Sequence, residues 1–209
     1  MNVIITGSVG CGKSTLINRI LPIFDKQEFK YYYFPEFLHK DDFAHELVKK
    51  KFCNEISALT FQSYIMDKWL KMVKEFKPKE SSFDIKLFER LPEDAVEVFA
   101  KLSLDEIELK TQISKLIRIN DILNVSYYKM NEIDTIWIYY VNDFKEHNEE
   151  YNKFKMSYLI GLIIKLIKSE NYKNIVVEMF SPSNLSNTMD IRKRDGEIYT
   201  NNSMSRLND

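Results

Sequence analysis

Several features that mark particular protein classes are scarce in this sequence. Its 209 residues contain only two cysteines, Cys11 and Cys53, too few for the disulfide framework of a small secreted domain. Acidic and basic residues nearly balance, and a formal net charge of −1 gives no electrostatic case for binding nucleic acid or a membrane surface. The chain starts directly with a strand-like segment and shows no signal peptide. These absences predict a cytoplasmic protein whose partners include neither nucleic acid nor membrane.

Long uninterrupted apolar runs are missing as well. The most apolar helical stretch, 157–167, has lysines within it and on both sides, and the apolar part is too short to span a bilayer. It is therefore predicted to be a buried core helix. Apolar residues make up 44% of the chain, and 209 residues suffice for one α/β domain with a sizeable core.

Glycine is also scarce, yet three of the five glycines fall within one short segment. The segment follows an apolar run at 3–5, precedes a helical pattern at 16–21, and fits the sequence G-x-x-x-x-G-K-[ST] of a phosphate-binding loop. Its residues are Gly7, Ser8, Val9, Gly10, Cys11, Gly12, Lys13, Ser14 and Thr15. The alternative is a glycine-rich turn that binds nothing, but a chance match with both flanks present is rare.

This loop predicts that the chain binds a nucleoside triphosphate. Glycine permits positive φ, which lets the backbone curl so that its N–H groups surround an anion. The N-terminus of the following helix also directs positive charge at phosphate. We expect Lys13 to reach the β- and γ-phosphates and the Ser14 hydroxyl to ligate Mg²⁺.

Strand-like and helix-like segments alternate along the first 180 residues. The expected strands are 2–6, 31–34, 83–88, 135–141 and 174–180, and the expected helices are 13–21, 41–52, 56–76, 93–102, 104–125 and 149–168. Pro22 is expected to end the first helix. The alternation predicts an α/β fold in which a five-stranded parallel sheet is flanked by helices on both faces. We expect a single domain over 1–182 and a polar, flexible tail over 183–209.

Polar residues follow the second and third strands, where a parallel sheet binds its ligands. Glu36 can take a proton from an attacking hydroxyl, or is simply an acid in the first turn of a helix. Glu89 can hold Mg²⁺ and Arg90 can neutralise a phosphoryl group in transfer, or the two form a surface ion pair. Gln62, on an otherwise apolar helix, offers a donor and an acceptor to a nucleobase, or is an ordinary helix glutamine.

These motifs resemble those of the deoxyribonucleoside kinases, the family of deoxycytidine kinase, deoxyguanosine kinase and mitochondrial thymidine kinase. Besides the phosphate loop, the resemblance rests on Phe34-Pro35-Glu36, Phe61-Gln62-Ser63-Tyr64 and Phe88-Glu89-Arg90, in the family's order within residues 2–100. It implies a P-loop kinase fold in which Glu36 is the general base on the substrate 5′-hydroxyl. It also implies that Gln62 and Phe61 contact the nucleobase. Glu89 would lie near Mg²⁺ and Arg90 near the reacting oxygens.

The chain departs from the family pattern at several places. Proline precedes Glu36 instead of following it, and Leu91 replaces a serine after Arg90. The arginine-rich lid that the family has after its fourth strand can be placed in two ways. Strand counting favours 142–151, which has no arginine, whereas 181–197 contains Arg192 and Arg194 but requires 174–180 to be the fourth strand. The sugar 3′-hydroxyl would be held by Glu149, Glu150 or Glu197.

The sequence thus predicts an ATP- and Mg²⁺-dependent kinase that phosphorylates a deoxyribonucleoside at its 5′-hydroxyl, in nucleotide salvage. Its partner would be a small-molecule deoxynucleoside, and the long apolar helices could support a homodimer. A nucleoside monophosphate kinase of the thymidylate kinase type is a first alternative. A degenerate family member that binds nucleotide with little catalysis is a second alternative, motivated by the arginine-poor lid.

Overall fold

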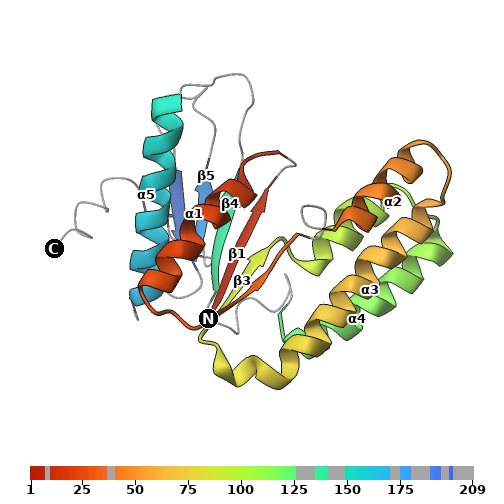
Figure 1. The fold of residues 1–209 in the computed structure, drawn as a ribbon, viewed down its shortest axis with the longest axis horizontal. Helices are drawn as coiled ribbons and strands as arrows, with labels where there is room; N and C mark the ends of the chain where they lie inside the picture. Colours follow the sequence, from red (N-terminus) through yellow and green to blue (C-terminus); the bar gives the residue numbers. More distant parts are fainter. Residues whose placement is uncertain are drawn as a thin grey trace. The chain divides into compact units, whose positions relative to one another are not determined.

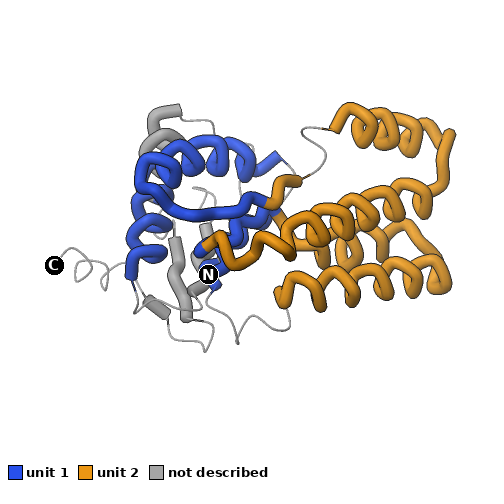
Figure 2. Tube along the Cα trace, turned by 60° about the horizontal axis from the view of Figure 1, so that its bottom comes forward, with its two compact units in different colours: residues 1–33, 84–89, 130–209 blue, residues 34–83, 90–129 orange. Residues whose placement is uncertain are grey.

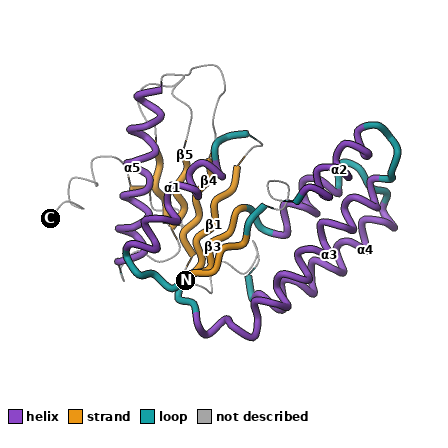
Figure 3. The backbone as a smooth tube through the Cα atoms, viewed as in Figure 1, coloured by secondary structure: helices purple, strands orange, loops and turns teal. Residues whose placement is uncertain are grey.

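The chain folds into two compact units (Figure 2). The computed structural model describes residues 1–7, 10–36, 41–125, 135–140, 149–169, 175–179, 189–193 and 198–199. Unit 1 is formed by residues 1–33, 84–89 and 130–209, and unit 2 by residues 34–83 and 90–129. The strands belong to unit 1, apart from the last residue of one strand, and unit 2 is helical (Figure 3).

The elements follow one another as the sequence predicts, with η2 added between α3 and β3 and with β6 and β7 added near the C-terminus (Figure 1). The strands are β1 (Asn2–Gly7), β2 (Tyr31–Phe34), β3 (Ile85–Glu89), β4 (Thr135–Tyr140), β5 (Ile175–Met179), β6 (Met189–Lys193) and β7 (Ile198–Tyr199). The helices are α1 (Lys13–Lys26), α2 (Asp42–Phe52), α3 (Ala58–Phe76), η2 (Lys77–Ser82), η3 (Asp94–Ala100), α4 (Glu106–Leu123) and α5 (Glu149–Lys168).

The strands form one sheet in the order β2-β3-β1-β4-β5-β6-β7. β1 pairs in parallel with β3 and with β4, and β4 pairs in parallel with β5. This confirms the predicted α/β fold with a parallel sheet flanked by helices. The central strand β1 carries the phosphate loop at its carboxyl end, which is where such sheets bind ligands.

The number of strands differs from the prediction. Four strands, β3, β1, β4 and β5, are joined by parallel registers, and β2 lies beside β3 in the strand order. Within 183–209, where no strand was predicted, β6 pairs antiparallel with β5 and β7 antiparallel with β6. Antiparallel pairing at a sheet edge needs only backbone N–H and C=O groups, so a polar segment can extend the sheet without an apolar pattern.

Two helices, α1 and α5, pack together on one face of the sheet (Figure 1). Their apolar stripes and the inward side chains of β1, β3 and β4 form the core of unit 1. Fully buried members include Val3, Ile5, Leu16, Ile17, Ile20, Phe24, Leu87, Ile138, Leu159 and Ile163. This core fixes the end of β1 relative to the start of α1, the two elements that flank the phosphate loop.

The first helix continues past Pro22, contrary to the prediction that it stops there. It runs to Lys26, with Pro22 inside it. Proline in a helix interior removes one backbone hydrogen bond and costs about 3 kcal/mol. The turn beyond Pro22 carries Phe24, which is completely buried and packs edge-on against Phe29 and Tyr31. Burial of a phenylalanine contributes about 1.5–3 kcal/mol, enough to offset most of that cost.

Unit 2 is a helical assembly built on α3 and α4. The buried face of α3 carries Trp69, Val73 and Phe76, and the Phe34 ring lies 6.2 Å from Trp69 and 5.0 Å from Phe76 between ring centroids. Helix α4 starts at a capping box, in which Asp105 accepts from Ile107 N and Glu108 N while Glu108 accepts from Asp105 N. No helix in the described part of the chain has the length and hydropathy needed to cross a membrane.

Candidate active site

The three glycines of the phosphate loop have backbone conformations that favour glycine. Gly7, Gly10 and Gly12 have φ angles of 143°, 78° and 97°, all in the region that favours glycine. Gly12 is the N-cap of α1, and no side chain caps the first turn of this helix. A glycine at this position offers no side-chain acceptor to the first turn, and helix N-termini of this kind can bind an anion.

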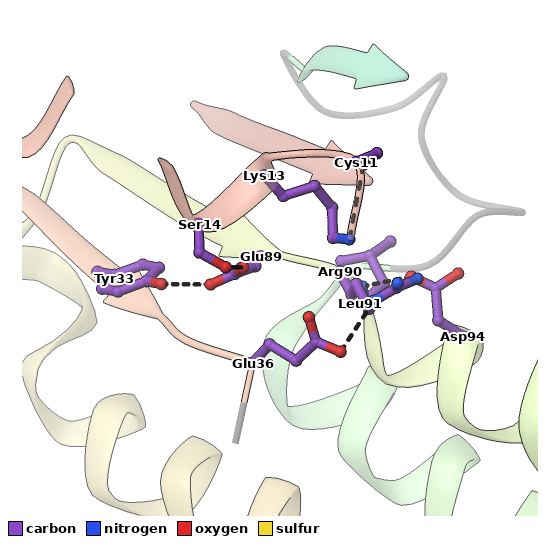
Figure 4. Close-up of polar contacts among 9 residues, drawn as sticks. All are labelled: Cys11, Lys13, Ser14, Tyr33, Glu36, Glu89, Arg90, Leu91 and Asp94. Carbon is purple, nitrogen blue, oxygen red and sulfur yellow. Dashed lines mark hydrogen bonds and ion pairs between the residues drawn. The ribbon is translucent and has the colours of Figure 1, made fainter. Parts of the chain in front are cut away.

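The first turn of α1 presents the two side chains expected to bind phosphate and metal. Lys13 is buried, and its Nζ lies 3.8 Å from Cys11 Sγ, within the loop itself (Figure 4). Ser14 is partly exposed and points toward the end of β3 (Figure 4). Thr15 is exposed. Lys13 and Ser14 therefore lie together at the start of α1, and their expected roles toward phosphate and metal stay predictions.

Glu89, the last residue of β3, lies beside Ser14. Ser14 Oγ donates a hydrogen bond to Glu89 Oε1 at 2.6 Å, and Tyr33 OH donates to Glu89 Oε2, also at 2.6 Å (Figure 4). The glutamate is only 2% exposed. β3 and β1 are neighbours in the sheet, and Ile5 pairs with Glu89, which explains why this carboxylate meets the start of α1.

The next residue, Arg90, belongs to unit 2 and pairs there with Glu36. Arg90 Nε donates to Glu36 Oε1 at 3.1 Å, and the two side chains are 10% and 17% exposed. The Arg90–Glu36 pair is therefore largely buried, and the roles expected of both residues stay predictions. The Arg90 guanidinium carbon also lies 5.7 Å from the centroid of the Phe99 ring, a cation–π distance.

Two features of Arg90 indicate a functional position. Its φ is 67°, a conformation that costs a non-glycine residue roughly 1–2 kcal/mol. Its Nη2 is buried and has no hydrogen-bond partner in the described part of the chain. A buried guanidinium nitrogen without an acceptor is costly, and an anionic ligand would supply the acceptor.

Gln62 and Phe61 lie on α3, in unit 2. Gln62 is 2% exposed, and its Nε2 is buried with no partner among the described residues. The Phe61 ring is buried, and Lys51 Nζ lies 5.4 Å from its centroid. Gln62 is therefore not an exposed helix glutamine, and its expected contact with a nucleobase stays a prediction.

Several predicted site residues cannot be compared with the structure. Ser8, Val9 and Arg194 lie outside the described residues, as do 142–148 of the favoured lid segment. Glu149 is the first residue of α5, and Arg192 lies in β6 with its Cα opposite Val176 of β5. β4 and β5 are both strands of the sheet, which agrees with the strand count that favoured 142–151 as the lid. The position of the lid itself stays a prediction.

The sequence did not mark two residues near these positions as members of the site. Tyr33 was assigned only to a strand, because nothing in its neighbourhood indicates a polar partner 56 residues away. Asp94 is buried and accepts from Leu91 N at 3.1 Å, where it closes the turn after Arg90. The only signal for Asp94 was its place in the run Leu91-Pro92-Glu93-Asp94-Ala95, two acids among apolar residues.

The donor set around the loop fits Mg²⁺. This ion prefers oxygen ligands and is usually held by one or two protein groups together with phosphates and water. The Ser14 hydroxyl and the buried Glu89 carboxylate supply such oxygens side by side. No group of three or more His, Cys, Asp or Glu side chains gathers into a metal cluster in the described part of the chain.

Solved structures similar to this chain include nucleoside and nucleotide kinases. Thymidylate kinase from Ehrlichia chaffeensis is 14% identical, with 88% of this chain and 89% of that chain covered and a TM-score of 0.44. Deoxyadenosine kinase from M. mycoides with bound dATP is 20% identical, with coverages of 82% and 86% and a TM-score of 0.39. Thymidylate kinase from Candida albicans is 11% identical, with coverages of 87% and 83% and a TM-score of 0.38.

A search of curated proteins gave no match. A comparison with protein-family models did give one. The protein-family model of the deoxynucleoside kinases matches residues 3–153, more than half of the chain. The match includes the phosphate loop and the segments around Glu36, Gln62 and Arg90, so it confirms the resemblance inferred from those motifs. The chain therefore belongs to the deoxynucleoside kinase family, whose members are nucleotide-binding phosphotransferases.

Proposed function

We propose that this protein uses ATP and Mg²⁺ to phosphorylate a deoxyribonucleoside at its 5′-hydroxyl. The observation that carries the proposal is the buried Glu36–Arg90 pair, in which Arg90 Nη2 has no acceptor among the described residues. A carboxylate and a guanidinium held together suit a reaction in which a hydroxyl loses a proton while a phosphoryl group gains charge.

In unit 1, the residues of the phosphate loop would bind the donor nucleotide. Lys13 and the backbone N–H groups of the loop, from Gly7 to Thr15, would hold the β- and γ-phosphates. Ser14 and Glu89 would supply oxygens to Mg²⁺. When bound, the ion would add positive charge at the phosphate oxygens. Arg192 and Arg194 are proposed as further contacts to the phosphates of ATP.

In unit 2, Glu36 would accept the proton of the 5′-hydroxyl, and Arg90 would stabilise the charge on the transferred group. Phosphoryl transfer needs mainly positioning and charge stabilisation, and so it requires no further covalent chemistry from the chain. Gln62 would hydrogen-bond the nucleobase, with Phe61 beside it. Glu149 would hold the sugar. The reaction would serve nucleotide salvage in the cytoplasm.

The test is ADP release from ATP and Mg²⁺ with thymidine, deoxycytidine, deoxyadenosine or deoxyguanosine, and with their monophosphates. Glu36→Gln keeps the size of the side chain and removes the base, so we expect kcat to fall by about 10²-fold or more. Glu75→Gln is the matched control, because it removes a carboxylate from an exposed pair with Lys71. The control should retain wild-type turnover.

The acceptor panel separates the proposal from its rivals. Turnover on a deoxynucleoside that collapses in Glu36→Gln supports the proposal and identifies the preferred base. Turnover on a monophosphate alone would indicate a nucleoside monophosphate kinase. Nucleotide binding without turnover on any acceptor would indicate a family member that has lost efficient catalysis.

A further inference from the structure

Strand β2 carries two tyrosines on one face whose hydroxyls both bind carboxylates. Tyr31 and Tyr33 are two residues apart, so their side chains lie on the same face of the strand. Both rings pack against the core of unit 1. Tyr31 OH donates to Asp25 Oδ1 at 2.8 Å, and Tyr33 OH donates to Glu89 Oε2 at 2.6 Å. The two bonds have the same chemistry, but Asp25 lies in the last turn of α1, whereas Glu89 adjoins the phosphate loop.

The Glu89 carboxylate is held at both of its oxygens. Ser14 Oγ donates to Oε1 and Tyr33 OH donates to Oε2, each at 2.6 Å (Figure 4). Two short hydrogen bonds from different elements, α1 and β2, fix both the position and the rotation of the carboxylate plane. A carboxylate has about four lone-pair sites, so accepting these two hydrogen bonds does not by itself fill it.

We propose that Tyr33 is a positioning residue for the metal site, which fixes the Glu89 carboxylate so that it accepts hydrogen bonds from the water ligands of the metal ion. The inference rests on the proposed function to the extent that Ser14 and Glu89 serve the metal. The inference adds Tyr33, which the sequence motifs do not include, and it specifies that Glu89 acts on the metal ion through water.

The hydrogen-bond directions support water-mediated contact. The Ser14 proton lies between Oγ and Glu89 Oε1, so the lone pairs of Oγ are directed away from Glu89. A cation bound to one of those lone pairs would be off the line to the carboxylate. Mg²⁺ keeps several of its waters in proteins, and these waters are strong hydrogen-bond donors. Groups that orient metal ligands in this way commonly change metal affinity by 10–100-fold when removed.

The test measures metal binding directly. Mn²⁺ replaces Mg²⁺, the β,γ-imido analogue of ATP replaces ATP, and electron paramagnetic resonance measures free Mn²⁺. Tyr33→Phe keeps the ring in the core and removes only the hydroxyl, and we expect the Mn²⁺ Kd to rise roughly tenfold. Tyr31→Phe removes the same group from the same face of β2 and should leave the Kd within about twofold of wild type.

A double variant and a second substitution test the route of the effect. In a Glu89→Gln background, Tyr33→Phe should cause no further weakening of Mn²⁺ binding. Glu89→Asp keeps the charge but retracts the carboxylate from both hydroxyls, and it should also weaken binding. An unchanged Mn²⁺ Kd in Tyr33→Phe would overturn the proposal. It would also be overturned if Tyr33→Phe weakened Mn²⁺ binding as much in the Glu89→Gln background as it does in the wild type. If Tyr33→Phe does not fold, wild-type affinity in Glu89→Asp overturns it instead.

The readout keeps this inference separate from the proposed function, because metal and nucleotide binding need no acceptor substrate. If no deoxynucleoside is phosphorylated but the Mn²⁺ pattern holds, the proposed function fails and the role of Tyr33 stands. If turnover is observed and Tyr33→Phe binds Mn²⁺ normally, the role of Tyr33 fails alone. With an active enzyme, Tyr33→Phe should raise the Mg²⁺ concentration needed for half-maximal rate and leave kcat at saturating Mg²⁺ near wild type.

Discussion

Two side chains of the proposed site each have a buried polar atom without a partner in the described part of the chain. Arg90 Nη2 and Gln62 Nε2 are both buried and lack a hydrogen-bond partner among the described residues. Leaving such a donor unpaired costs about 1–3 kcal/mol. Arg90 adds the strain of a φ of 67°. A folded protein tolerates these costs where a ligand supplies the missing acceptor, as the proposed phosphoryl and nucleobase contacts would.

Gln62 allows this cost to be measured. Gln62→Leu replaces the amide with an apolar group of similar size, so we expect the unfolding midpoint to stay the same or rise, since no unpaired donor remains buried. The same change should raise the KM for the deoxynucleoside by about tenfold or more, because a hydrogen bond to the base is lost. Thermal unfolding and steady-state kinetics check the two effects.

Gln112 provides the matched control. It is completely buried on α4, and its Oε1 also lacks a partner among the described residues, but its Nε2 donates to Ser63 Oγ at 2.9 Å. Gln112→Leu therefore removes an existing hydrogen bond, which Gln62→Leu does not, and should have the lower unfolding midpoint of the two variants. A loss of stability in Gln62→Leu as large as that in Gln112→Leu would show that the Gln62 amide has a structural partner and would contradict its assignment to substrate binding.

At the scale of elements, one carboxylate both caps α2 and links it to α3. Asp41 is the N-cap of α2 and accepts from Ala44 N at 3.1 Å. It also forms a 2.7 Å ion pair with Lys68 and accepts from Tyr64 OH at 2.6 Å. The Lys68 and Tyr64 hydrogen bonds hold the pKa of Asp41 well below its usual range. The cap and the helix contact thus depend on the same ionised group.

The sign of the pH effect follows from that lowered pKa. As pH falls, Asp41 takes up a proton in the unfolded chain before it does in the folded chain, so its contribution to stability is present above about pH 4 and declines below it. Asp41→Asn keeps a capping side chain but has no charge. The difference in urea midpoint between wild type and Asp41→Asn should therefore be largest near neutral pH and should shrink below about pH 4.

The pH series needs a comparison at a second helix cap. Asp105 caps α4 and has no ion pair among the described residues. Asp105→Asn should consequently change the urea midpoint less than Asp41→Asn does at neutral pH. A difference between wild type and Asp41→Asn that does not change between pH 7 and pH 3 would rule out an ionised Asp41 as the source of the stability.

At the scale of the whole molecule, neither compact unit is a continuous piece of chain. Unit 2 consists of 34–83 and 90–129, and between them β3 belongs to the sheet of unit 1. The boundaries fall next to functional positions, because Glu89 ends the unit 1 segment and Arg90 begins the unit 2 segment. The proposed metal residue and the proposed transition-state residue are therefore covalent neighbours in different units.

Nucleotide binding should stabilise the folded chain by mass action. A ligand present at 100 times its Kd adds about 2.7 kcal/mol to the free energy of unfolding. We expect ATP with Mg²⁺ to raise the thermal unfolding midpoint of the wild type. Lys13→Met should abolish most of this shift, because it removes the buried ammonium that is proposed to bind the phosphates. Differential scanning fluorimetry over a range of ATP concentrations measures both.

Lys50 supplies the control for this experiment. It is an exposed lysine on α2, paired with Glu46 at 2.6 Å within the same helix. Lys50→Met also removes one positive charge, but it should leave the ATP-induced shift unchanged. Equal shifts in wild type and Lys13→Met would contradict the assignment of Lys13 to the donor phosphates.

The sequence by itself determined the phosphate loop and the order of the elements. The loop is local: three glycines at fixed spacing permit the positive φ angles that are observed, and the flanking apolar patterns make a strand and a helix. The family follows from four such local motifs in order. The end of α1 was missed because the effect of Pro22 is local, whereas the burial of Phe24 that offsets it depends on the core.

Only the tertiary structure decided which side chains meet. Ser14 and Glu89 are 75 residues apart, Glu36 and Arg90 are 54 apart, and Tyr33 and Glu89 are 56 apart. The bond between Ser14 and Glu89 depends on the position of β3 beside β1, and no residue near either partner in the sequence specifies that neighbour. β6 and β7 were unforeseen for a related reason, because backbone pairing at a sheet edge is nearly independent of side chains.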